Sequence, residues 1–195
     1  MASLADNFDQ LWQRLRYGRG LSHTGDDPVY YLVFHPSEML EVKRRLRQWA
    51  AILKKQDWTM ETFSMAEAIR DIFEKNEFRE DVWLASEQDK CFDADSVKQV
   101  NEQLASALLD EGALKQRLAD KLQSLDARSN TVLFVSDLEA LHPYLRVGVL
   151  EQQLQGRFTV PTVFLYPGIR DGKTTLKFLG IYPADGNYRS VHIGG

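Results

Sequence analysis

The sequence contains a single cysteine, Cys91, and no long apolar run. One cysteine excludes an intramolecular disulfide. No apolar stretch approaches the roughly 20 residues that a helix needs to cross a bilayer. The first eight residues also lack the basic segment and the following apolar segment of a secretory leader. These absences predict a cytoplasmic protein that is not associated with a membrane.

Internal repeats and low-complexity segments are also missing, and the composition is that of an ordinary folded protein. Hydrophobic residues make up 44% of the chain and charged residues 27%, a balance that indicates neither disorder nor a membrane protein. The 195 residues are enough for one domain with a proper core and leave little room for a second. The formal net charge of −4 gives no overall attraction to nucleic acid, so direct binding to DNA is not expected.

Nearly continuous apolar runs alternate with segments of helical spacing along the chain. A run of this kind is typical of a strand that is buried on both faces of a parallel sheet. The predicted strands are 29–34, 58–63, 131–135 and 162–166, and the predicted helices are 3–17, 37–55, 64–73 and 138–155. The alternation predicts an α/β fold in which a mostly parallel sheet is flanked by helices.

The remaining segments complete one predicted domain, residues 1–195. Helical spacing indicates a helical insertion at about 76–126, and two short alternating segments, 174–179 and 188–193, indicate edge strands or a hairpin. Proline is tolerated only near a helix start, so the last helix begins at Pro143 in an alternative interpretation. N-caps are expected at Ser3, Ser37 and Ser64.

The segment Gly-Ile-Arg-Asp-Gly-Lys-Thr at 168–174 looks at first like a phosphate-binding loop. A P-loop has four residues between its first glycine and the Gly-Lys-Thr, whereas this segment has three. The residues that follow are typical of a strand and not of a helix that could hold a phosphate. We therefore favour a turn around Asp171 and Gly172. The alternative is a degenerate nucleotide-binding protein that uses Lys173 and Thr174 for phosphate and Asp137 for magnesium.

The other polar residues give no convincing catalytic set. Asp137 follows an apolar strand, where the simplest interpretation is a cap for the next helix. The four histidines are isolated and show no metal-ligand spacing; they are His23, His35, His142 and His192. Two of them follow strands, but capping and packing are commoner uses of such histidines than catalysis. We expect no catalytic residues, no metal site and no cofactor.

The densest basic cluster consists of Lys43, Arg44, Arg45 and Arg47 on a predicted helix. The apolar residues of that helix face elsewhere, so the favoured interpretation is a solvated helix face. The alternative is a phosphate-binding patch, which would make the chain a nucleic-acid-binding accessory subunit.

Several short motifs follow one another in the C-terminal third. Tyr-Pro-Gly occurs at 166–168, Asp-Gly at 171–172, Phe-Leu-Gly at 178–180 and Asn-Tyr-Arg at 187–189, while His-Pro-Tyr-Leu-Arg stands upstream at 142–146. In this order the motifs resemble those of the BrxB family of BREX bacteriophage-exclusion systems. Members of that family typically carry Tyr-Pro-Gly, Asp-Gly, Leu-Phe-Gly and a closing Asn-Tyr-Tyr-Arg. This sequence departs by having one tyrosine in the last motif and Leu179 before Gly180.

The resemblance implies a non-enzymatic core component of a phage-defence system, acting as an assembly or regulatory subunit. The implied partner is the phosphatase-like PglZ protein, and other BREX components are further partners to consider. Loops at the carboxyl ends of parallel strands carry function in this architecture, and arginine and tyrosine are enriched at interfaces. The residues expected to contact a partner are Tyr166, Gly168, Arg170, Asp171, Lys173, Asn187, Tyr188 and Arg189.

Overall fold

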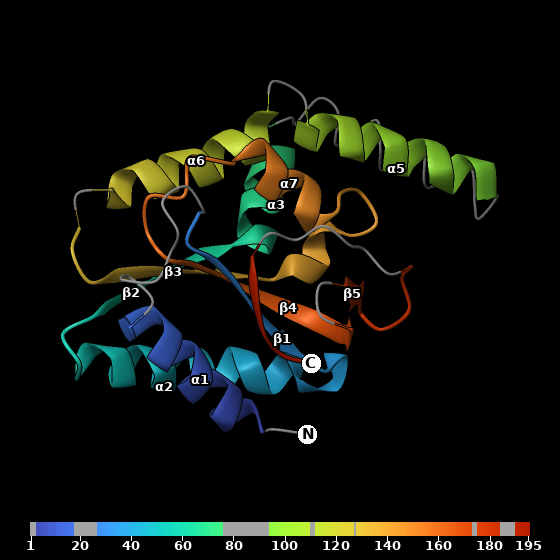
Figure 1. Cartoon of the computed structure of the whole chain (residues 1–195). Coiled ribbons are helices and arrows are strands. Elements are labelled where there is room, and N and C mark those ends of the chain that lie inside the picture. The colour runs from blue at the N-terminus through green and yellow to red at the C-terminus, as the bar shows by residue number, and fades with distance from the viewer. Residues whose placement is uncertain are drawn as a thin grey trace.

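The computed structural model describes residues 3–17, 27–75, 94–109, 112–126, 128–172, 175–183 and 190–195. Six strands and the helices around them form one layered unit in these residues (Figure 1). The first part of the predicted helical insertion, residues 76–93, lies outside the described ranges. So do Lys173, Asn187, Tyr188 and Arg189, for which the predictions remain predictions.

The predicted α/β fold is confirmed. Five strands form a parallel sheet in the order β2-β3-β4-β1-β6; their bounds are Thr59–Ser64, Thr131–Ser136, Thr162–Asp171, Val29–Phe34 and Val191–Gly194. The sixth strand, β5 (Thr175–Phe178), pairs antiparallel with the end of β4. Of the two short C-terminal segments, β6 is an edge strand as predicted. β5 forms its hairpin with β4, so the alternative of a hairpin between the two segments is wrong.

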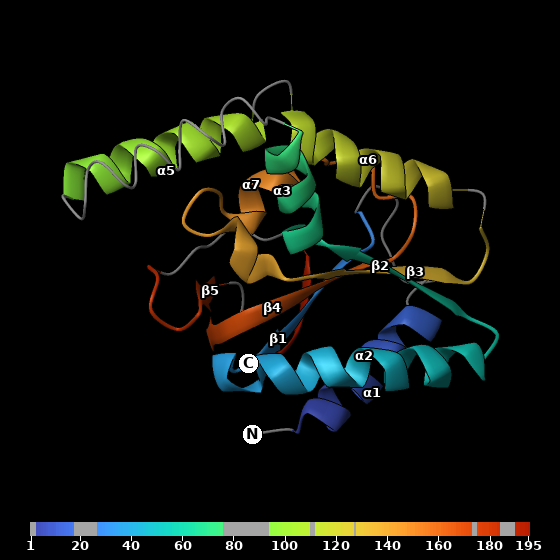
Figure 2. The same ribbon diagram turned by 180° about the vertical axis from the view of Figure 1, so that it is seen from behind.

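Helices cover both faces of the sheet (Figures 1 and 2). On one face lie α1 (Leu4–Tyr17) and α2 (Met39–Lys54); on the other lie α3 (Met65–Glu74), α6 (Ala113–Leu125) and α7 (Val147–Gln153). The remaining long helix, α5 (Ala94–Leu109), packs beside α3 and α6 and projects beyond that layer. Each central strand is therefore enclosed by helices on both sides.

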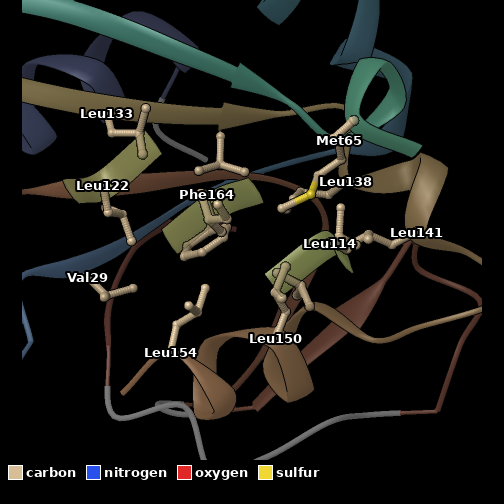
Figure 3. Close-up of a cluster of buried hydrophobic side chains, with 14 of the residues drawn as sticks. Val29, Met65, Leu114, Leu122, Leu133, Leu138, Leu141, Leu150, Leu154 and Phe164 are labelled. Carbon is tan, nitrogen blue, oxygen red and sulfur yellow. The ribbon is translucent and has the colours of Figure 1, made fainter. Parts of the chain in front are cut away.

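This enclosure explains the continuous apolar runs of the central strands. Successive side chains of a strand point to opposite faces. In β1, Tyr31 and Val33 enter the core beneath α3, α6 and α7, whereas Leu32 and Phe34 enter the core beneath α1 and α2. Figure 3 shows the first of these cores, where Phe164 of β4 meets leucines from the surrounding helices. In the second core the ring of Phe8 stacks on Trp49 with ring centroids 4.6 Å apart.

Two of the three predicted serine caps are confirmed. The Ser3 hydroxyl accepts a hydrogen bond from the Asp6 amide, and the Ser64 hydroxyl accepts one from the Glu67 amide, both at 3.2 Å. The third prediction, Ser37, is wrong because a short 3-10 helix, η2 (Pro36–Glu38), precedes α2.

The cap of this 3-10 helix is His35. Its Nδ1 accepts from the Ser37 amide over 3.3 Å, and the Glu38 carboxylate accepts from the His35 amide over 3.0 Å. The two bonds form a reciprocal capping box. His35 thus has the capping role that the sequence favoured over catalysis.

The long helix predicted at 138–155 is interrupted. The structure has a 3-10 helix, η4 (Leu138–Leu141), followed by a non-helical connection, and α7 begins only at Val147. Proline disfavours a helical conformation in the residue before it, and His142 is extended, with φ −93° and ψ 138°. The alternative start at Pro143 is therefore wrong by four residues. The connection 142–146 has a role in the site described below.

Candidate functional site

The carboxyl ends of the parallel strands form one edge of the sheet, where two connections diverge. After β1 the chain turns to α2 on one face, whereas after β3 it turns to η4 and α7 on the other. β4 lies between these strands, and open α/β sheets bind ligands at such a point. Here β4 continues past the end of β1 to Asp171 and pairs with β5. The hairpin thus stands where a ligand crevice would otherwise open.

A strand, and not a helix, follows the Gly-Lys-Thr sequence. β5 begins at Thr175 and runs antiparallel to β4, and Gly172 lies between the two strands with φ 79°. A phosphate loop needs a helix N-terminus at this point. The predicted turn is confirmed, and the nucleotide-binding alternative lacks the helix on which it depends.

Asp137 is the centre of a polar cluster at the same edge. Its Oδ2 accepts hydrogen bonds from the hydroxyls of Ser64 and Ser136, at 2.6 and 2.8 Å. Its Oδ1 lies 2.6 Å from the Nζ of Lys43, which also contacts Glu139 at 2.8 Å. The cluster joins the ends of β2 and β3 to α2 and thereby connects elements on both faces of the sheet.

The carboxylate of Asp137 does not cap a helix, contrary to the sequence interpretation. Asp137 precedes η4 with a left-handed backbone, φ 58° and ψ 38°, and its side chain makes no capping hydrogen bond. Burial acts to raise the pKa of Asp137, but the hydrogen bonds from Lys43, Ser64 and Ser136 outweigh burial and hold the pKa below its ordinary value of 3.8. The group is therefore ionised at neutral pH and engaged by three donors.

The magnesium alternative for Asp137 finds no support in these contacts. Both oxygens already accept hydrogen bonds from protein donors, one of them a lysine. Within the described ranges, no three His, Cys, Asp or Glu side chains come together as metal ligands. The contacts are those of a carboxylate that links neighbouring strands by hydrogen bonds, and they do not suit a cation site.

The basic cluster on α2 is partly neutralised. Lys43 contacts Asp137 and Glu139, and Arg45 pairs with Glu41 one turn before it at 2.7 Å. Arg44 and Arg47 are exposed on the helix surface. The acidic partners of Lys43 and Arg45 reduce the positive charge of the cluster, while Lys43, Arg44 and Arg47 are all exposed, as the favoured solvated helix face requires. Binding of phosphate by these residues stays a prediction.

A hollow lies beside the hairpin, between β4, β5 and the connection that precedes α7. It encloses about 400 Å³, including the space at its open mouth. Its walls are mainly apolar and aromatic; they are formed by Leu138, Leu141, His142, Leu145, Arg146, Val147, Tyr166, Phe178, Tyr182 and Pro183. Aromatic rings pack in series along it, with 5.3 Å between the centroids of Tyr166 and Phe178 and 3.7 Å between those of His142 and Tyr182.

Three of the motifs that carry the family resemblance meet at this hollow. Tyr-Pro-Gly contributes Tyr166 from β4, and Phe-Leu-Gly contributes Phe178 from β5. His-Pro-Tyr-Leu-Arg contributes His142, Leu145 and Arg146 from the connection between η4 and α7. Segments whose residues are 12 to 36 positions apart in sequence therefore form one surface feature.

Two histidines of this region are neutral at physiological pH. Burial lowers the pKa of His142, and the charge of Arg146 lowers it further. Burial lowers the pKa of His192 to about 4, and the charge of Arg170 acts in the same direction. Of these two histidines His142 lines the hollow, and the described residues of the hollow wall include no carboxylate. His23 lies outside the described residues.

The structure places the predicted partner-contacting residues at different depths. Tyr166 is buried and reaches the hollow with its ring, and Gly168 is buried behind it. Arg170 lies on the outer part of the hairpin, where its Nε donates to the Gly172 carbonyl over 3.0 Å. Asp171 is exposed and pairs with Lys177 at 2.8 Å. Contact with a partner remains a prediction for all of them.

Sequence reasoning missed the aromatic wall and the serine donors. Ser64 and Ser136 each end a strand, and neighbouring parallel strands place such residues side by side. The pairing of Ser64 with Ser136 in register could have been found from that rule, given the strand order. Phe178 belongs to the Phe-Leu-Gly motif, but neither Phe178 nor Tyr182 could be placed beside Tyr166 from the sequence. The sequence does not fix how far β4 extends or where β5 folds back.

A second buried polar contact fixes α7 to the sheet. The Tyr31 hydroxyl of β1 donates to Oε2 of Glu151 over 2.6 Å. Burial raises the pKa of Glu151, and the negative charge of Asp27 adds to this, while hydrogen bonds from Tyr31 and Ser190 oppose it. The folded-state pKa of Glu151 is raised above the unfolded-state value of 4.5. The stabilisation that Glu151 contributes is therefore fully present below pH 4.5 and is lost as the pH rises through the folded-state pKa.

We expect Tyr31→Phe to lower the free energy of unfolding by about 1.5 kcal/mol at neutral pH. The loss should be smaller near pH 4, because Glu151 is then protonated in the folded state and needs the donor less. Urea unfolding at the two pH values measures both quantities. Tyr30→Phe, on the same strand, is the control and should have an effect below about 0.5 kcal/mol. An equal loss at both pH values would show that the hydroxyl does not act on the ionised carboxylate.

Taken together, the fold and the site define a class of protein. It is an α/β domain with a parallel sheet, whose ligand edge is closed by a hairpin and carries an aromatic hollow. None of the helices in the described ranges has the length and apolar character for a membrane span.

The model of one protein family, described as BREX protein BrxB, matches residues 61–193 of the 195. The chain therefore belongs to the BrxB family, and the resemblance noted in its motifs is confirmed. The match includes the hairpin, the connection before α7 and every residue of the hollow wall. The elements α1, β1 and α2 lie before the matched residues. No curated protein and no solved structure matches the chain.

Proposed function

We propose that this BREX phage-defence component is a non-catalytic assembly or regulatory subunit that binds the PglZ-type protein of its system. The observation that supports the proposal most is the convergence of three family motifs on one hollow at the carboxyl edge of the sheet. Motifs that served folding alone would not need to share a surface opening. Aromatic side chains around a surface opening are typical of a site that binds a partner protein.

The polar groups at the same edge support a role without catalysis. Both oxygens of Asp137 accept from protein donors, namely Lys43, Ser64 and Ser136, and such contacts are typical of a structural carboxylate. Among the described residues of the hollow wall there is no acid, and the pKa of His142 is lowered by burial and by the charge of Arg146. A general acid–base pair needs two groups with complementary protonation states within reach of a substrate. The described part of the wall supplies mainly apolar contact instead.

Co-purification tests the proposal directly. The tagged chain and the PglZ-type protein of the same system should elute as one complex after nuclease treatment, with a Kd of about 1 μM or tighter, equivalent to roughly 8 kcal/mol. The nuclease removes any complex bridged by DNA, and an unrelated α/β protein with the same tag is the negative control. Failure to recover a complex, with all other BREX components present, would contradict the proposal.

A further inference from the structure

We infer that the open edge of strand β2 pairs antiparallel with the same edge of a second copy of this chain, about a two-fold axis at Thr62. The sheet of one copy then continues into the sheet of the other. This pairing is independent of the proposed partner, because β2 contributes none of the described residues that line the hollow. The exposure of β2, the direction of its backbone groups and the position of its one charge lead to it.

β2 is the last strand on one side of the sheet, and its outer edge is open to solvent. Among the described strands it pairs with β3 alone, in register over all six residues. In Figure 2 it lies between α2 on one face and α3 and α6 on the other. Thr59 and Thr62 are exposed, whereas Phe134, which is aligned with Thr62 on β3, is fully buried. The helices therefore cover the faces of β2 but not its outer edge.

β2 lacks several features that commonly protect an edge strand from pairing. Such strands are often very short, bulged, or interrupted by proline or lysine. β2 reads Thr-Met-Glu-Thr-Phe-Ser, and its regular register with β3 leaves no bulge. The strand at the opposite side of the sheet, β6, has only four residues. β2 is therefore the longer of the two outer strands and the better template for another strand.

The backbone groups on the outer edge belong to alternate residues. The Thr59 amide donates to the Asn130 carbonyl over 2.8 Å, so the backbone of Thr59 faces β3. In a parallel ladder, residues that bond to one neighbour alternate with residues whose groups point to the other side. The outward-facing residues of β2 are therefore Met60, Thr62 and Ser64. A row of backbone donors and acceptors of this kind is matched by an extended strand.

A second copy of the chain supplies a strand that matches this row. When the two-fold axis passes through Thr62, Thr62 of one copy pairs with Thr62 of the other, and Met60 pairs with Ser64 at each end. Every outward-facing residue then has a counterpart, and corresponding faces of the two sheets stay on the same side. Opposed threonines stabilise paired strands. Dimers with a two-fold axis are also the commonest assemblies of soluble proteins.

The charge of Glu61 selects this register over its neighbour. An axis moved to Glu61 would place two Glu61 side chains directly opposite each other, where like charges are destabilising. An axis at Thr62 places Glu61 opposite Phe63 of the second copy instead. The Glu61 carboxylate also contacts Lys121 at 2.8 Å and Arg128 at 2.9 Å within its own chain. Its charge is therefore compensated and does not repel an approaching strand.

Light scattering after size-exclusion chromatography tests the pairing. The chain alone should be mostly a dimer at about 100 μM and should dissociate on dilution, because one short strand from each copy gives a small interface with a Kd of about 10 μM. Thr62→Pro removes an outward amide and none of the bonds to β3, so it should raise the Kd at least about tenfold while thermal unfolding shows a folded chain. The control is Ile181→Glu, since Ile181 is 77% exposed and lies outside β2. It should dimerise as the unmodified chain does.

Cysteine cross-linking tests the register without a proline. Cys91→Ser first removes the one native cysteine. In that background Thr62→Cys should form an intermolecular disulfide under mild oxidation, because paired residues of an antiparallel ladder lie about 5.5 Å apart. Thr59→Cys is the matched control, because Thr59 is also exposed on β2 but lies about 20 Å from its counterpart in this register. Thr62→Cys should cross-link at least about ten times as much as Thr59→Cys.

The other outcomes overturn the inference. A chain that stays monomeric at the highest concentration has no such pairing. A dimer that survives Thr62→Pro, or that Ile181→Glu dissociates, has its interface elsewhere. Equal cross-linking of the two cysteine variants contradicts the register. If the chain alone is monomeric and Thr62→Pro no longer binds the PglZ-type protein, the edge takes a strand of that protein and not a second copy, while the proposed function stands.

Discussion

Asp137→Ala is expected to lower the free energy of unfolding by about 4 kcal/mol. The side chain is 17% exposed and accepts two short hydroxyl hydrogen bonds, each worth about 1.5 kcal/mol to a charged acceptor. The ion pair with Lys43 adds little, because that lysine is 45% exposed and solvent screens the pair. Alanine also tolerates the left-handed backbone at this position less well than aspartate, which adds about 1 kcal/mol.

Two further variants at the same position separate the contributions. Asp137→Asn keeps the shape and the tolerance of a positive φ but loses the charge, so it should lose about half as much stability. Asp137→Gly relieves the backbone while removing every side-chain contact, so it should be less destabilising than alanine by about 1 kcal/mol. Urea unfolding at neutral pH ranks the three. If asparagine matched the unmodified chain, the ionised carboxylate would have no stabilising role.

The pH dependence of the same group gives an independent check. The folded-state pKa of Asp137 is lowered below 3.8. Its stabilising contribution is therefore fully present above the unfolded-state value and is lost as the pH falls through the folded-state pKa. Below pH 3.8 the free energy of unfolding should fall less steeply with decreasing pH in Asp137→Asn than in the unmodified chain. A profile with the same slope in both would assign the acid limb to other carboxylates.

The Asp137 cluster also shows which parts of the site the sequence could predict. Its strand was evident, because residues 132–135 are apolar without interruption, as burial on both faces of a sheet requires. The position of Asp137 at the strand end was evident for the same reason. Its partners were not, because Lys43 comes from a helix 94 residues earlier in the chain. Only the sheet order brings α2 to that end of β3.

The error in the predicted helix at 138–155 has a local cause with a long-range consequence. Leucines at helical spacing continue through Pro143, so the periodic pattern outweighed the breaker. In the structure Pro143 interrupts the helix, and the chain between η4 and α7 is extended at His142. This break allows His142, Leu145 and Arg146 to face the hairpin together. The resemblance to the family identified these residues, but spacing alone gave no reason for them to lie beside β5.

The hairpin itself should be sensitive to one methyl group, in the variant Gly168→Ala. We expect this change to lower the free energy of unfolding by about 3 kcal/mol and the Tm by roughly 6–12 °C. A Cβ at this position would lie 2.4 Å from the Lys177 carbonyl oxygen and 2.5 Å from a ring carbon of Tyr166. The carbonyl belongs to the paired strand β5 and the ring is buried, so neither can move aside without breaking the hairpin or the wall of the hollow.

Gly172→Ala is the matched control in the same hairpin. Gly172 has φ 79°, but a Cβ there would meet nothing within 4 Å. Replacing Gly172 with alanine should therefore lower the free energy of unfolding only by the cost of a side chain on a left-handed backbone, about 1 kcal/mol. Gly168 has no positive φ, so its larger loss would come from contact alone. Equal losses in the two variants would show that β5 does not approach β4 as closely as described. A Gly168→Ala protein that still folds should bind the PglZ-type partner more weakly than Gly172→Ala, because Tyr166 forms part of the hollow.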